Sequence, residues 1–93
     1  MTDRNEDSLS NTPVTHLRNL GPKSSECLSA VGIQTLGDLE RVGAVVAFRI
    51  VQEAGYGATA NLLYALDATL QGIDWRALTP EDRARLREQA GIK

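Results

Sequence analysis

The sequence predicts an all-α fold, a compact orthogonal bundle of five to six short helices. Apolar residues recur three and four positions apart in successive segments, as on the buried face of a helix. The two-residue alternation of strands is almost absent, and Gly or Pro punctuates the chain at short intervals. A chain of 93 residues is expected to form one domain.

The first thirteen residues, Met1 to Pro13, are expected to form a disordered polar tail, and residues 14–93 the helical domain. The tail contains four charged side chains, and Leu9 is its only large aliphatic residue. It therefore cannot bury enough apolar surface to offset the entropy lost on ordering.

The first two helices are expected to flank the Gly21-Pro22 pair. Leu17 and Leu20, three residues apart, indicate a short first helix that begins at residue 14 or 15. Proline fits the first turn of a helix, so the second helix is expected from Pro22 to about residue 31. Beyond it, a left-handed glycine cap and a hydrophobic residue that folds back are expected at Gly32 and Ile33. The apolar face of this helix is expected at Cys27, Leu28 and Val31.

Two further helices are expected with almost no connector between them. Thr35 is expected to cap the third helix, with Asp38 in the reciprocal capping position. Gly43 ends this helix, and the fourth extends from residue 44 to about residue 54. The Gly55-Tyr56-Gly57 stretch then forms a turn. The residues expected to face the core are Leu36, Leu39, Val42, Val46, Ala47, Ile50 and Val51.

The fifth helix, from residue 59 or 60 to residue 71, has the clearest helical pattern and is expected to lie at the centre of the core. Its Leu62, Leu66 and Leu70 repeat every four residues, and Leu63 and Ile73 widen this apolar stripe. The last helix is expected after the cap Thr79, and it ends at about residue 89. It is mostly charged, which is typical of a surface helix, and Trp75 before it is expected to close the bottom of the core.

The residues needed for catalysis or metal binding are missing. His16 and Cys27 are the only histidine and cysteine, whereas zinc sites use three or four such ligands. A Cys–His nucleophile also needs direct contact and an orienting group. The carboxylates of Asp38, Glu81 and Asp82 have structural explanations, and no glycine-rich phosphate loop is present. We therefore predict no enzyme, no cofactor and no metal site.

The chain is expected to act in the cytoplasm without a membrane partner. Its longest apolar run, residues 44–48, is far too short to span a bilayer. The N-terminus lacks the pattern of a secretory signal, and one cysteine cannot form an internal disulfide. The net charge is −2 and no segment is strongly basic, so any contact with nucleic acid must be local.

One segment offers a binding mechanism. Residues 17–39 read LRNLGPKSSECLSAVGIQTLGDL, and the first part resembles a helix-hairpin-helix motif, with Asn19 in the place of its first glycine. In that motif, turn amides and the start of the second helix face a DNA phosphate, because unpaired amides and the helix dipole attract anions. The alternative is that the glycines only separate packed helices. The predicted phosphate contacts are Asn19, Gly21, Lys23, Ser24 and Ser25.

A longer series of motifs, from residue 17 to residue 76, resembles the C-terminal domain of the TfoX/Sxy competence-regulator family. This resemblance implies a small helical fold of the helix-hairpin-helix or SAM-like kind. It also implies transcription regulation in bacterial competence, together with a cyclic-AMP receptor protein. The full regulators have an additional N-terminal domain, so a stand-alone accessory protein is the alternative. The motifs are LRNLGPKS (17–24), GIQT (32–35), DL (38–39), GA (43–44), NLLYAL (61–66) and GIDWR (72–76).

The leading hypothesis is a non-enzymatic regulatory or adaptor module that binds a protein partner, such as transcription machinery, with weak DNA backbone contact. Direct DNA binding and a structural, self-associating role are the alternatives, and the oligomeric state stays open. Tyr64 and Trp75 are candidates for the partner surface, while Asn61 is expected to cap or bridge a turn. Arg83, Arg85 and Arg87 are expected to form a solvated charged surface, since alternate residues on a helix do not share a face.

Overall fold

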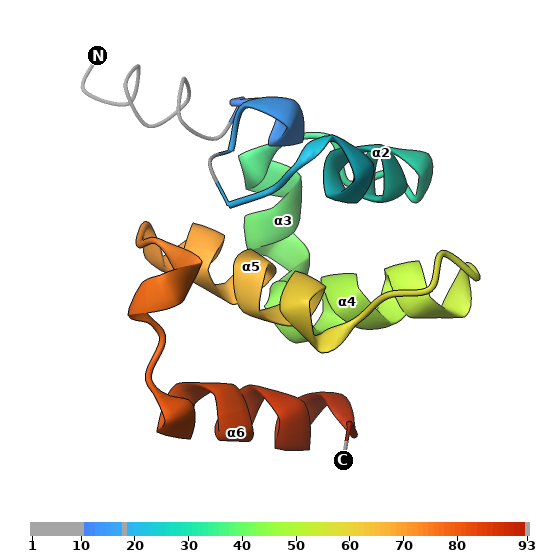
Figure 1. The fold of residues 1–93 in the computed structure, drawn as a ribbon. Helices are drawn as coiled ribbons and strands as arrows, with labels where there is room; N and C mark the ends of the chain where they lie inside the picture. The colour runs from blue at the N-terminus through green and yellow to red at the C-terminus, as the bar shows by residue number, and fades with distance from the viewer. Residues whose placement is uncertain (1–10, 18, 93) are drawn as a thin grey trace.

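The computed structural model describes residues 11–17 and 19–92 and confirms the all-α fold (Figure 1). Within these residues the only pairing of strand type is an isolated antiparallel bridge between Pro13 and Thr35. Figure 1 shows α2 and α6 on opposite sides of the pair formed by α4 and α5. The elements are the 3-10 helix η1 (Val14–His16), α2 (Pro22–Ala30), α3 (Leu36–Val42), α4 (Ala44–Glu53), α5 (Ala60–Gln71), the 3-10 helix η2 (Trp75–Ala77) and α6 (Pro80–Ala90).

The predicted first helix is wrong in extent, because η1 is a single 3-10 turn after which Leu17 is extended. Tertiary hydrogen bonds limit it: the amide of Val14 donates to the carbonyl of Gln34 at 2.9 Å, and the amide of Leu36 donates to the carbonyl of Thr12 at 2.8 Å. Residues 12–14 are thus tied to residues 34–36. The rest of the predicted tail, residues 1–10, lies outside the described residues.

The capping signals after α2 are confirmed. Gly32 has a φ of +89°, and the amide of Ile33 donates to the carbonyl of Leu28 at 2.9 Å, which returns Ile33 to the core. At the start of α3, the hydroxyl of Thr35 accepts from the amide of Asp38, and the Asp38 carboxylate accepts from the Thr35 amide. Thr79 and Asp82 form the same capping box on α6. These reciprocal bonds satisfy amides that a helix start leaves unpaired.

Hydrogen bonds at both boxes stabilise the ionised carboxylates. The pKa of Asp38 lies below its usual value, chiefly because the backbone amide of Gln34 donates to the carboxylate, with further contributions from Thr35 and Arg41. The pKa of Asp82 is lowered mainly by the backbone amide of Thr79. Both carboxylates are therefore bound as anions at helix starts, where the helix dipole also favours negative charge.

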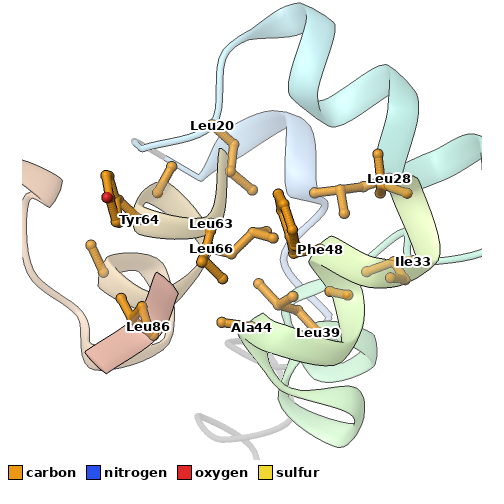
Figure 2. Packing of buried hydrophobic residues seen from close by; sticks show 14 of the residues in the cluster. Leu20, Leu28, Ile33, Leu39, Ala44, Phe48, Leu63, Tyr64, Leu66 and Leu86 are labelled. Carbon is orange, nitrogen blue, oxygen red and sulfur yellow. The ribbon is translucent and has the colours of Figure 1, made fainter. Parts of the chain in front are cut away.

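The core is centred on Phe48 of α4, which packs among leucines of α2, α3 and α5 (Figure 2). The predicted central helix α5 shares the centre of the fold with α4, since α5 contacts α3, α4, α6 and η2 and α4 contacts α2, α3, α5 and α6. In the described chain, no helix has the length and apolar character needed to cross a membrane. The largest buried apolar side chains are Phe48, Leu28, Leu39, Leu63, Leu66, Val14 and Val51.

Of the residues predicted to face the core on α4, Ala47 and Val51 are confirmed as buried, whereas Val46 and Ile50 are wrong. Val46 is 49% exposed and Ile50 is half-buried, whereas Ala44, Ala47, Phe48 and Val51 are buried. These buried positions follow the three- and four-residue spacing of one helix face, and the large ring of Phe48 fixes which face it is. On α5 the predicted Leu63 and Leu66 are fully buried, whereas the predicted Leu62 and Leu70 are only partly buried.

Two valine-to-alanine substitutions in α4 test this assignment. Val51→Ala removes fully buried carbon atoms and is expected to lower the free energy of unfolding by about 2–3 kcal/mol. Val46→Ala is expected to change it by less than about 0.5 kcal/mol, because that side chain is exposed. Urea unfolding of both variants measures the difference, and equal losses would contradict the assigned face.

Candidate functional site

The side chain of Asn19 joins two parts of the domain that are far apart in the sequence. Its Nδ2 donates to the carbonyl of Ile73 at 2.7 Å, and its Oδ1 accepts from the amide of Trp75 at 3.0 Å. We call this pair of bonds the Asn19 clasp. The backbone of Asn19 is not left-handed, since no described residue other than glycine has a positive φ. The clasp fixes the position of the Ile73–Trp75 turn against the segment between η1 and α2, here called the hairpin.

The other predicted phosphate contacts lie at the start of α2 but differ in accessibility. Gly21 has an extended backbone with a φ of −77°, and Lys23 is exposed. Ser24 is half-buried, whereas Ser25 is 1% exposed. The Ser25 hydroxyl donates to the carbonyl of Val14 at 3.1 Å, and its amide to the carbonyl of Gly21 at 3.0 Å. Lys23 and Ser24 are therefore the donors that this turn offers to a ligand, and the phosphate contact stays a prediction.

A pocket of about 300 Å³ lies where the hairpin, the start of α5 and η2 meet. We call it the Trp75 pocket. A smaller hollow of about 170 Å³ adjoins it, shares Ser24 and Thr59, and reaches Lys23 and the exposed ring of Tyr56. The residues that line the Trp75 pocket are Asn19, Ser24, Thr59, Asn61, Leu62, Ala65 and Trp75.

Two helix starts open toward the Trp75 pocket. Both α2 and α5 begin without a side-chain cap and without an acidic residue in the first turn, whereas α3 and α6 have full capping boxes. Ser24 lies in the first turn of α2, and Thr59 is the residue before α5. The amide ends of helices carry partial positive charge. The lining contains no carboxylate, so its polar part suits a group that accepts hydrogen bonds, beside the apolar surface of Leu62 and Ala65.

Trp75 does not close the core, contrary to prediction. Its side chain is 39% exposed, while Tyr64 is only 6% exposed. The smaller apolar side chains of Leu78, Leu86 and Ala90 are buried and anchor the last helix instead. Of the two proposed partner-surface residues, the structure places Trp75 on the surface and the ring of Tyr64 in the core.

Two arginines of α6 lie against these aromatic rings, which the sequence interpretation missed. The guanidinium of Arg83 lies 5.5 Å from the ring centres of both Tyr64 and Trp75. Nη1 of Arg87 donates to the hydroxyl of Tyr64 at 3.0 Å. Both arginines are half-buried. The four-residue spacing of Arg83 and Arg87, which places them on one helix face, is the signal that could have revealed the pair.

The described residues show no cluster of three or more His, Cys, Asp and Glu side chains that could hold a metal ion. Cys27 is half-buried beside the smaller hollow, and His16 is exposed at the end of η1. The two residues lie in different elements, and neither lines the Trp75 pocket.

Sequence comparison supports the family suggested by the motifs. The model of the TfoX C-terminal domain matches residues 8–90. The chain belongs to the TfoX C-terminal domain family. This is a regulatory type of domain rather than a known enzyme family. No curated protein matches the chain significantly.

Two crystal structures from Listeria monocytogenes share the fold of this TfoX C-terminal domain. One, an uncharacterized protein in a triclinic form, has 28% sequence identity and a TM-score of 0.76, over 87% of this chain and 97% of that chain. The other, a protein of unknown function in a tetragonal form, has 30% sequence identity and a TM-score of 0.75, over 83% of this chain and 94% of that chain. The similarity therefore extends over nearly the whole of both relatives, and their descriptions assign no function.

The Asn19 clasp can be tested by its contribution to stability. Asn19→Ala leaves the carbonyl of Ile73 and the amide of Trp75 without their partner and is expected to lower the free energy of unfolding by about 1–3 kcal/mol. The matched control Asn61→Ala removes an exposed amide and is expected to cost less than about 0.5 kcal/mol. Equal losses in urea unfolding would show that the clasp does not stabilise the fold.

Proposed function

We propose that this TfoX C-terminal domain is a non-catalytic regulatory or adaptor module that binds a protein partner at the Trp75 pocket. The observation that carries the proposal is the exposed indole of Trp75. Its backbone amide is held by Asn19 and its ring lies beside Arg83. An exposed tryptophan held in place loses little conformational freedom on binding, and tryptophan is enriched among residues that dominate interface energies.

The chemistry of the pocket favours a protein partner. Its lining combines apolar surface from Leu62 and Ala65 with the polar groups of Asn19, Ser24 and Asn61. Such a mixture is typical of sites that take one apolar side chain and bind the neighbouring backbone. The net charge of −2 disfavours extended nucleic-acid contact. Components of the transcription machinery, in the cytoplasm, are the class of partner that the family suggests.

Site-specific photo-crosslinking tests this proposal. A photoreactive amino acid at position 61, inside the pocket, is expected to give a discrete adduct with another protein in the source cells. The same probe at position 40, an exposed site on α3 outside the pocket, is the matched control. Trp75→Ala is expected to weaken the position-61 adduct at least about tenfold, which corresponds to 1.4 kcal/mol. No adduct at position 61, or one indifferent to Trp75→Ala, would contradict the proposal.

A weak contact with a DNA phosphate is a second candidate function. It is favoured by the open start of α2, where Lys23 is exposed and no side chain caps the helix. In this proposal the amides of Lys23 and Ser24, together with the Lys23 ammonium, bind one phosphate.

Titration of the isotope-labelled protein with short duplex DNA at low salt tests the phosphate contact. Amide shifts confined to residues 19–25 and reversed by added salt are expected, because the contact is electrostatic. Lys23→Glu should remove them, since it places a like charge beside the phosphate. Unchanged amides in this segment at low salt would show that it is only a structural turn.

A further inference from the structure

Arg83 contains a buried donor that the described fold does not satisfy. Its Nε is buried and has no hydrogen-bond acceptor among the described residues. Leaving a buried donor unpaired is unfavourable, and most buried polar atoms in proteins have partners. The charge of Arg83 therefore lies beside an exposed tryptophan while its Nε–H has no acceptor in the described fold.

The two aromatic rings hold the Arg83 guanidinium without using its donors. Both ring centres, of Tyr64 and Trp75, lie 5.5 Å from its central carbon. Cation–π attraction acts through the faces of the rings. The N–H groups of arginine point outward in the plane of the guanidinium, in a fork that matches the two oxygens of a carboxylate. The rings thus restrict the position of Arg83 and do not occupy its Nη groups, through which a ligand would reach the guanidinium because Nε is closed to solvent.

No acidic side chain lies one helical turn from Arg83. Three and four residues away along the chain lie Thr79, Pro80, Leu86 and Arg87.

The nearby carboxylates have other partners. On α6, Asp82 pairs with Arg85 at 3.3 Å, and on η2 Arg76 pairs with Asp74 at 3.1 Å. Asp67, on the neighbouring α5, accepts from Gln71. The face of α6 that carries Arg83 and Arg87 is therefore locally positive on a domain whose net charge is −2.

We propose that Arg83 binds a carboxylate of an acidic protein segment, while an apolar side chain next to that carboxylate enters the Trp75 pocket. The inference rests on the proposed function, since it defines the chemistry of the partner that docks there. Trp75 connects the two features, because it lies against Arg83 and also lines the pocket. A protein carboxylate is favoured over a nucleic acid because two arginines on an acidic domain cannot neutralise a run of phosphates.

The side-chain Nε–H signal of Arg83 in the isotope-labelled full chain gives a direct test. The probe is a synthetic peptide, acetyl-Glu-Glu-Leu-Leu-amide, and its counterpart with Gln in place of Glu is the control ligand. The Glu peptide is expected to shift the Arg83 signal and the Trp75 fluorescence in a saturable way, and the Gln peptide to bind at least about tenfold more weakly. Arg83→Gln should reduce the affinity for the Glu peptide by a similar factor, whereas Arg85→Gln, at the arginine paired with Asp82, should leave it unchanged.

The inference is overturned if the Glu peptide does not move the Arg83 signal. It is also overturned if the Glu and Gln peptides bind with equal affinity. Because both of these results come from the wild-type chain, the test survives if Arg83→Gln fails to fold. A larger shift with a single-stranded oligonucleotide of equal charge would assign the site to nucleic acid instead.

The failure of this inference can be distinguished from the failure of the proposed function. A position-61 adduct that is lost in Trp75→Ala but unchanged in Arg83→Gln overturns the carboxylate contact and leaves protein binding at the pocket intact. The absence of any adduct that depends on Trp75 overturns the proposed function itself.

Discussion

The hydrogen bonds of one side-chain amide, that of Asn19, join two surface segments of this domain. They connect the hairpin before α2 to the turn between α5 and η2, across 54 and 56 residues of sequence. Because one of the two bonds is made to the backbone of Trp75, the clasp sets where the indole lies. The indole in turn forms one wall of the pocket and lies against the guanidinium of Arg83. Pocket, aromatic ring and arginine therefore make one site, whose geometry depends on a bond outside the apolar core.

The distribution of helix caps supports the proposal that this face binds a partner. The starts of α3 and α6 are closed by their own Thr–Asp boxes, which satisfy the free amides and place a carboxylate at the positive end of the helix. The starts of α2, α4 and α5 have neither, and residues at the starts of α2 and α5 line the Trp75 pocket. A domain with a net charge of −2 thus has a local surface that favours negative ligands. The arrangement of charges on this face, more than the net charge of the domain, supports the proposal of an acidic partner.

Features set by neighbours in the sequence were predictable, and features set by distant contacts were not. The Thr35–Asp38 box, the left-handed Gly32 and the extent of α5 follow from local propensity and capping, and the structure confirms them. The first helix was overestimated because its backbone is bound by Gln34 and Leu36, which no local pattern reveals. In α4 the run of apolar residues permits several faces, and only the packing of Phe48 selects one. At the site, the sequence drew attention to Asn19 and Trp75, but the bond between them and the position of Arg83 required the fold.

The most direct test of the account is native-state hydrogen exchange at the amide of Trp75, measured in the wild type and in Asn19→Ala. If the clasp positions the indole, this amide is protected in the wild type. In the variant its protection is expected to fall by more than that of core amides such as Leu66, and the Arg83 Nε–H signal to shift as the indole moves. Protection at Trp75 that falls only in step with the core, with an unmoved Arg83 signal, would show that the site forms without Asn19 and would contradict the account.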